Sequence, residues 1–198
     1  DGAIVTRKLL SVNPERYRDA ALHGIRALLD LGADAPVAAE AVDAVRMGTT
    51  VATNALLERK GARTLLCITR GFGDALRIGY QNRPQIFARR IVRPELLYER
   101  VIEIDERVSA QGEVLRALDA TAARAALQRA YADGFRSVAI VLLHAYRFAD
   151  HERRLADIAR ELGFTQVSVS HEVSPLMKLV SRGDTTTVDA YLSPVLRR

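Results

Sequence analysis

The chain has 198 residues, 48% of them hydrophobic and 27% charged, with a formal net charge of +5. This composition is typical of globular proteins, and no apolar run reaches the roughly 18 residues that a membrane-spanning helix needs. The positive charge comes from arginines that form no basic stripe with aromatic residues. It is therefore only weak evidence for nucleic acid, and it fits an anionic small ligand or an acidic partner surface just as well.

The single cysteine, Cys67, excludes an internal disulfide. Its apolar neighbours predict a buried, inert thiol rather than a nucleophile. A lone buried cysteine fits a reducing, cytoplasmic location.

The first third of the chain alternates between strand and helix patterns. We expect a strand over residues 3–10, a helix that begins at Pro14 and ends before Gly32, and a short helix over residues 36–42. A strand at residues 44–47 then leads into the most informative part of the sequence.

That part, residues 46–61, is predicted to be a strand end, a turn and a short helix. Gly48 allows the backbone to bend sharply or to approach a ligand closely. Thr49 and Thr50 are candidate N-caps, and Gly61 stands where a glycine commonly ends a helix.

Two polar residues inside this short helix, Thr53 and Asn54, are mediocre helix formers because their side chains compete for backbone hydrogen bonds. Their presence behind a Gly-Thr-Thr turn suggests that the polar groups bind something. A capped helix whose polar side chains are satisfied locally explains the same pattern.

The rest of the chain continues the alternation, with a long irregular connection at residues 79–97. Strands are predicted at residues 63–69, 101–108, 114–115, 137–143 and 166–170, and helices at 119–133 and 150–162. This order predicts an α/β fold, a mixed sheet with flanking helices, over one region of residues 1–198 with possible sub-lobes 1–95 and 96–198.

Three polar turns are predicted to precede helices, and each contains glycine beside hydroxyl or arginine side chains. They are Gly48-Thr49-Thr50, Thr69-Arg70-Gly71 and Arg182-Gly183-Asp184-Thr185-Thr186. Backbone N–H groups at such turns suit phosphate or another anion. Together the three turns suggest a nucleotide-type anion site.

No other constellation points to a specific chemistry. The histidines at positions 23, 144, 151 and 171 lack metal-ligand spacing, so structural roles are favoured for them and no metal site is predicted within the chain, although His144 and His171 follow strands and could face a cleft. There is neither a Walker-type phosphate loop nor a Gly-x-Ser-x-Gly motif.

The segment from Met47 to Gly61 resembles the signature of the hydantoinase A/5-oxoprolinase family. Three further stretches, 69–74, 104–108 and 182–192, are similar to that family in order and spacing. Arg46-Met47, together with residues 8–11, looks most like the 5-oxoprolinase branch. The resemblance covers essentially the whole chain.

The resemblance implies an ATPase fold related to actin-like proteins and sugar kinases, and an enzyme that uses ATP and Mg²⁺ to activate an amide or carbonyl oxygen. In the 5-oxoprolinase branch this activation drives ring opening of 5-oxo-L-proline to L-glutamate. The alternatives are ATP-dependent hydantoin hydrolysis, ketone carboxylation, or a non-catalytic interaction module. The implied partners are a small-molecule substrate and the remainder of the chain or a hydantoinase B-type part, without nucleic acid or membrane.

Family members open with a Gly-Gly-Thr-Phe-Thr-Asp phosphate-binding hairpin, whereas this sequence starts at Asp1, where that hairpin should already have ended. The 198 residues are therefore expected to be inactive alone. A sheet edge that the hairpin would cover is expected to promote oligomerisation.

The resulting hypothesis places the polar residues of the three turns in one cleft. Thr49, Thr50 and Asn54 are the candidate catalytic residues. The candidate substrate- or phosphate-binding residues are Gly48, Arg70, Gly71, Arg83, Arg182, Gly183, Asp184 and Thr185. Hydroxyl and amide groups would orient oxygen atoms, while arginines would balance negative charge.

Overall fold

The computed structural model describes residues 2–11, 13–46, 48, 50–81, 85–93 and 95–197. These residues group into two compact units, Asp1–Gly48 and Thr49–Arg198, which are described in turn.

The first unit contains the helix α1 (Ala20–Leu28) and the short 3-10 helix η1 (Ala39–Ala41). The predicted start at Pro14 is wrong, because the Asp19 carboxylate accepts a hydrogen bond from Leu22 N at 2.8 Å and caps the helix there. None of the described residues of this unit is buried.

The strands predicted at residues 3–10 and 44–47 are also wrong for the residues that the structure describes there, which form no strand. A strand needs a neighbour for its N–H and C=O groups. Within the first unit no described segment supplies one.

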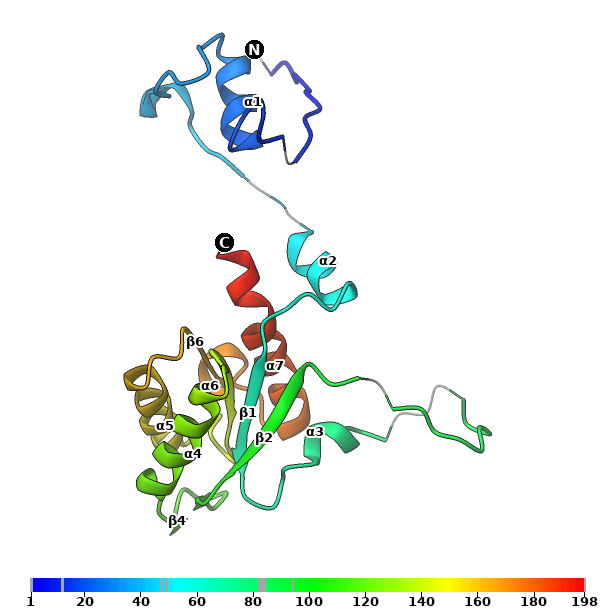
Figure 1. Cartoon of the computed structure of the whole chain (residues 1–198), viewed down its shortest axis with the longest axis vertical. Coiled ribbons are helices and arrows are strands. Elements are labelled where there is room, and N and C mark those ends of the chain that lie inside the picture. The colour runs from blue at the N-terminus through cyan, green and yellow to red at the C-terminus, as the bar shows by residue number, and fades with distance from the viewer. Residues whose placement is uncertain are drawn as a thin grey trace. The chain divides into compact units, whose positions relative to one another are not determined.

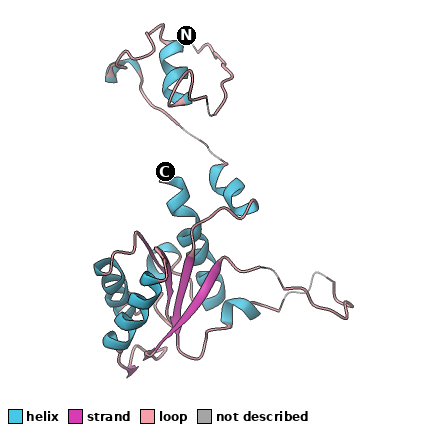
Figure 2. Cartoon of the chain, in the orientation of Figure 1, coloured by secondary structure: helices cyan, strands magenta, loops and turns pink. Residues whose placement is uncertain are grey.

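The second unit is built on a four-stranded parallel sheet with the order β2-β1-β5-β6 (Figures 1 and 2). Its strands are β1 (Thr64–Thr69), β2 (Tyr98–Ile104), β5 (Ser137–Val141) and β6 (Gln166–Val169). A separate antiparallel pair is formed by β3 (Arg107–Val108) and β4 (Val114–Arg116). Strands from both sides of residue 95 thus share one sheet.

Helices connect and cover these strands. They are α2 (Val51–Leu57), α3 (Ala75–Ile78), α4 (Ala120–Ala132), α5 (Asp150–Glu161), α6 (Ser170–Val173) and α7 (Leu179–Leu196). The predicted α/β class is confirmed. Within the described ranges, every helix falls short of the length and apolarity that crossing a bilayer requires.

The core has two layers because successive strand residues point to opposite faces of the sheet. Leu65 and Cys67 pack with α4 and α5 on one face, while Leu66 and Ile68 pack with α3 and α7 on the other. All six residues of β1 are buried, as its nearly continuous apolar sequence predicts. Burial raises the pKa of the Cys67 thiol to about 12, so the thiol stays protonated at neutral pH.

Helices α4 and α5 follow the sequence prediction closely. Asp119 caps α4 by accepting a hydrogen bond from Ala122 N at 2.9 Å. Leu155 and Ile158 of α5 are buried against the sheet, which confirms the predicted apolar stripe. Gly134 and Gly163 follow the two helices with positive φ angles of 91° and 95°.

Gly61 has a different role from the predicted helix end. Helix α2 ends at Leu57 with Glu58 as its C-cap, and Arg59 takes the left-handed conformation instead. A Cβ atom on Gly61 would lie 2.1 Å from the Tyr191 ring. Gly61 is therefore needed for the close approach of Tyr191, since any side chain would collide with the ring.

The third polar turn, predicted at residues 181–187, is wrong because these residues lie within α7. The hydroxyls of Thr185, Thr186 and Thr187 each donate to the carbonyl four residues earlier. The threonine hydroxyls thus form hydrogen bonds to carbonyl groups within the helix, and they do not end it.

Candidate functional site

The polar groups of interest gather at the carboxyl edge of the parallel sheet, where β1, β2 and β5 end. In open α/β sheets this edge is where ligands commonly bind. Thr69, Glu106 and Leu143 connect the strand ends there: Thr69 Oγ1 donates to Glu106 Oε1 and accepts a hydrogen bond from Leu143 N at 2.8 Å. This edge is our candidate site.

The predicted turn at Arg70 and Gly71 lies at this edge. Gly71 has a φ of 90°, which suits glycine. However, the N–H groups of Gly71 and Gly73 donate to the same oxygen of Glu103, at 2.8 and 3.1 Å. An internal carboxylate therefore takes the place that the sequence suggested for a ligand anion.

Arg70 is exposed, and its guanidinium lies 3.7 Å from the Asp105 carboxylate. It lines a cavity of about 330 Å³ together with Gly71 and with residues 105–107 and 115–116. Arg70 is thus placed where it can contact a ligand.

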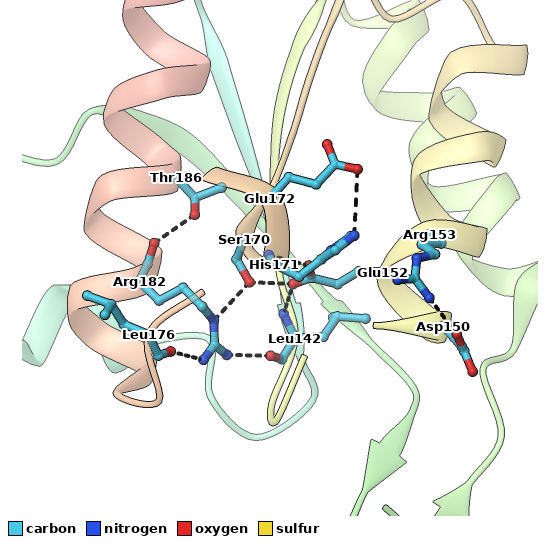
Figure 3. Close-up of polar contacts among 10 residues, drawn as sticks. All are labelled: Leu142, Asp150, Glu152, Arg153, Ser170, His171, Glu172, Leu176, Arg182 and Thr186. Atoms are coloured by element: carbon cyan, nitrogen blue, oxygen red, sulfur yellow. Dashed lines mark hydrogen bonds and ion pairs between the residues drawn. The ribbon is translucent and has the colours of Figure 1, made fainter. Parts of the chain in front are cut away.

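Arg182 is placed differently, because its side chain is fully buried. Nε donates to Ser170 Oγ at 2.8 Å, Nη1 to the Leu176 carbonyl at 2.7 Å and Nη2 to the Leu142 carbonyl at 2.6 Å (Figure 3). Burial lowers the pKa of the guanidinium, and the nearby Glu152 carboxylate opposes this shift. All of these contacts are internal, so this geometry gives Arg182 a structural role.

The network continues from Arg182 to a buried carboxylate (Figure 3). Ser170 Oγ donates to Glu152 Oε1 at 2.6 Å, and Leu142 N donates to the same oxygen at 2.8 Å. His171 Nδ1 lies 2.7 Å from the other oxygen, Glu152 Oε2. Arg182 and Glu152 thus join α7, α6, α5 and the end of β5.

A second buried carboxylate, Glu106, has a similar environment. One oxygen accepts from Thr69, and His151 Nδ1 lies 2.7 Å from the other. Sequence reasoning missed both Glu–His pairs. A signal was present at Glu152, which stands three residues before Leu155 on the apolar stripe of α5, where a charge must be paired.

The residues after Arg182 lie in the first turns of α7. Gly183 packs tightly on Leu76, because a Cβ atom there would lie 2.6 Å from it. Partial burial raises the pKa of the Asp184 carboxyl. Thr185 is exposed, but its hydroxyl donates to the Ser181 carbonyl.

Thr50 and Asn54 belong to α2 and are exposed. Thr50 is the N-cap residue but makes no side-chain capping bond, and Asn54 has no side-chain hydrogen bond to any described residue. The interpretation that Asn54 only satisfies its own helix is therefore not what the structure shows.

Asn54 and Arg182 lie far apart, because α2 contacts one end of α7 and Arg182 belongs to the other end. Helix α2 packs through Ala55 on Tyr191 and Leu192, near the carboxyl end of α7, whereas Arg182 is near its amino end. The rise from Arg182 to Tyr191 is about 14 Å. The described residues thus do not bring Asn54 and Arg182 into one cleft.

Three further predicted residues are Gly48, Thr49 and Arg83. Gly48 belongs to the first unit and is exposed there. Thr49 and Arg83 lie outside the described residues. The ligand-binding roles of Gly48, Thr49, Thr50, Asn54, Arg70 and Arg83 stay predictions.

Comparison with known proteins identifies relatives of the whole chain. The sequence is 40% identical to a 5-oxoprolinase of Dictyostelium discoideum over 97% of this chain, which corresponds to 18% of that relative. The crystal structure of an ATP-dependent caprolactamase from Pseudomonas jessenii superposes with a TM-score of 0.74 at 29% identity, over 94% of this chain and 28% of that one.

A nucleotide-free structure of acetone carboxylase, from work on ATP-dependent acetone carboxylation, is similar with a TM-score of 0.65 at 25% identity. The similar region covers 74% of this chain and 23% of that chain. The chain thus spans less than a third of the length of each of these proteins. Residues 1–163 match the hydantoinase/oxoprolinase N-terminal region. The chain therefore belongs to the hydantoinase/oxoprolinase family, and it does so through that N-terminal region.

Proposed function

We propose that the full-length protein is an ATP-dependent hydrolase that opens a cyclic amide, with 5-oxo-L-proline as substrate and L-glutamate as product. The observation that carries this proposal is the 40% identity to a 5-oxoprolinase over 97% of the chain. The fold shared with an ATP-dependent caprolactamase supports it, because caprolactam is also a cyclic amide.

The chemistry explains why such an enzyme uses ATP. A lactam carbonyl is a poor electrophile, since its nitrogen donates electron density to the carbonyl group. ATP, when bound, supplies a phosphoryl group that converts the amide oxygen into a better leaving group. Residues of this chain would bind and orient the two reactants.

Two places offer such contacts: the cavity at the carboxyl edge of the sheet, and the exposed polar groups of α2, which precedes the amino end of β1. Asn54 offers one carbonyl oxygen and two N–H donors, all without a partner among the described residues, and Thr50 offers a hydroxyl. With Gly48 and Thr49 before them, these groups would orient oxygen atoms of substrate or phosphate. Arg70 at the carboxyl edge of the sheet, and Arg83, would balance negative charge.

We propose a structural role for Arg182 rather than a role in ligand binding. By fixing the Leu142 carbonyl and Ser170, it holds the carboxyl edge of the sheet in place. Gly183 allows α7 to pack closely on Leu76, which supports the same structural role. A role for Asp184 or Thr185 in ligand binding remains a prediction.

Mg²⁺ is expected together with ATP, because it offsets phosphate charge in phosphoryl transfer. The described ranges bring together no group of three or more side chains suited to a metal ion. We therefore assign no residue of this chain to Mg²⁺.

Two alternatives concern chemistry and one concerns the class of protein. Hydantoin hydrolysis would use the same activation of a cyclic amide, and ketone carboxylation is favoured by the likeness to acetone carboxylase. A non-catalytic module would bind a partner without turnover. The remainder of the chain or a B-type part is the proposed partner in each catalytic case.

ADP release by the full-length protein distinguishes these functions. We expect 5-oxoproline to stimulate ADP release more than hydantoin, or than a ketone supplied with bicarbonate. Stimulation by hydantoin or ketone alone would favour the corresponding alternative. No stimulation by any of the three would favour the non-catalytic module.

A further inference from the structure

The cavity beside Arg70 has an unusual concentration of guanidinium groups. Arg70, Arg107 and Arg116 line it, and they come from three segments that follow or belong to different strands. Its volume of about 330 Å³ is at the lower end of the range of roughly 300–1,000 Å³ seen for ligand pockets. The cavity therefore suits a small molecule.

The charges around the cavity are not balanced internally. Asp105 is shared by two arginines, at 2.6 Å from Arg116 and 3.7 Å from Arg70. The Arg116 and Arg70 guanidinium groups hold the pKa of Asp105 below its usual range, so it stays ionised. Glu106 also lines the cavity, but Thr69 and His151 take its two oxygens. Among the lining residues, three guanidinium groups thus face two carboxylates, which leaves one positive charge in excess; Glu103, which binds the Gly71 and Gly73 N–H groups, is not among the lining residues.

Arg107 has donors to spare. Its Nη2 donates to the Arg70 carbonyl at 2.9 Å, and its guanidinium lies 5.2 Å from the Phe72 ring centre. These contacts fix the position of the side chain. Nε is buried and has no partner among the described residues, so a ligand cannot reach it, whereas Nη1 is not buried and makes no hydrogen bond to a described residue. A guanidinium held in place with an unpaired donor is what recognition of an oxyanion requires.

The backbone around the cavity adds no competing anion site. The N–H groups of Gly71 and Gly73 already bind Glu103, so a ligand must be recognised by the arginine side chains. Leu115, which is exposed, gives the cavity one apolar wall. This combination suits a compact molecule with a single negative charge and an apolar ring edge.

We propose that this cavity binds the carboxylate of the small-molecule substrate, with Arg107 and Arg116 as the recognising groups. The proposal deepens the proposed function and rests on it, because 5-oxoproline carries one carboxylate on a five-membered lactam ring. An excess of one positive charge matches a monocarboxylate better than a polyphosphate. Inorganic phosphate shares the oxyanion chemistry and is the other source that the test must separate.

The test is isothermal titration of the full-length protein with 5-oxoproline, with 2-pyrrolidinone, which is the same ring without the carboxylate, and with inorganic phosphate. We expect Arg107→Gln to weaken 5-oxoproline binding about tenfold or more and to leave 2-pyrrolidinone binding unchanged, because charge-assisted hydrogen bonds are lost. Arg116→Gln should act in the same direction. Its side chain is 57% exposed, so the fold does not depend on it.

Arg100→Gln is the matched control. Arg100 lies on β2, is 43% exposed and pairs with Asp133, away from the cavity. The Arg100→Gln variant should bind all three compounds as the unaltered protein does. Loss of phosphate binding alone in Arg107→Gln and Arg116→Gln, or no change in any affinity, would overturn the proposal.

Failure of this proposal and failure of the proposed function give different results. If Arg107→Gln binds and hydrolyses 5-oxoproline normally, the cavity proposal is wrong and the function stands. If 5-oxoproline binds in an Arg107-dependent manner but is never hydrolysed, the proposed function is wrong and the cavity proposal stands.

Discussion

Arg182 Nε and Ser170 Oγ lie 2.8 Å apart, and both side chains are fully buried. Ser170 Oγ accepts a hydrogen bond from Arg182 and donates one to Glu152. One hydroxyl group thus links the guanidinium and the carboxylate inside the protein. Buried charges are tolerated only when hydrogen bonds satisfy them, and here the backbone carbonyls of Leu142 and Leu176 complete the set.

Removing this buried cation should destabilise the second unit strongly. Arg182→Met keeps much of the side-chain volume but leaves four oxygen acceptors, Ser170 Oγ and the carbonyls of Leu142, Leu176 and Met177, without their donor, and it removes the positive charge near Glu152. We expect a loss of roughly 3–5 kcal/mol, which hydrogen exchange of α7 amides in the full-length protein would measure. Arg100→Met, which removes an exposed ion pair, should cost less than about 1 kcal/mol. Equal protection of α7 in Arg182→Met and the unaltered protein would contradict the structural role.

Adding one methyl group at Gly61 should loosen the packing of α2 on α7. A Cβ atom would lie 2.1–2.3 Å from three atoms of the Tyr191 ring, so the ring must move. Gly61→Ala should cost about 1–3 kcal/mol in melting experiments. Gly32→Ala is the control, because no atom lies within 4 Å of its added Cβ. If Tyr191 provides the obstacle, Tyr191→Leu should reduce the cost of Gly61→Ala.

Asn54→Ala should lower turnover of the full-length enzyme sharply while leaving its melting temperature nearly unchanged. The reason is that the Asn54 side chain is exposed and has no described hydrogen bond whose loss would reduce stability. Turnover and melting temperature measured on the same preparation check this. A large loss of stability with unchanged turnover per folded molecule would show that Asn54 is structural.

The Cys67 thiol should resist alkylation in the folded protein. Burial raises its pKa from 9.0 to about 12, so the thiolate that reacts is nearly absent at pH 8. Mass spectrometry should find the Cys67 peptide unlabelled until denaturant is added. Because the folded pKa is the higher one, the stabilisation from the neutral thiol is complete below about pH 9 and is lost as the pH rises towards 12. Rapid labelling of native protein at pH 8 would contradict this burial.

A strand or helix could be predicted from the sequence where the spacing of its apolar residues fits only one type of element. Strand β1 is apolar throughout, and α5 places Leu155 and Ile158 on one face, so both were predicted correctly. The helix predicted after residue 187 is present in α7, but the first turns of α7 were not predicted, because they contain glycine and three successive threonines, which usually mark a turn. Only the contacts of Gly183 with Leu76 and of Arg182 with the strand ends explain why this stretch is helical.

The candidate site was also predicted only in part. Sequence reasoning selected Arg70, which does line a cavity, and Asn54, whose exposed side chain has no hydrogen bond to a described residue. It could not show that Glu103 takes the N–H groups of the Gly71 turn, because residues 71 and 103 come together only through the pairing of β1 with β2. The same holds for Arg107 and Arg116, which meet Arg70 only in the folded protein.

The central claim is that the full-length protein couples ATP hydrolysis to ring opening of a cyclic amide. Its most direct test is a time course of ADP and glutamate formed from ATP and 5-oxoproline by the purified full-length protein. We predict that the two products appear in equal amounts and that omission of either reactant abolishes both. Release of ADP without glutamate, or the absence of both products under conditions where the protein is folded, would contradict the claim.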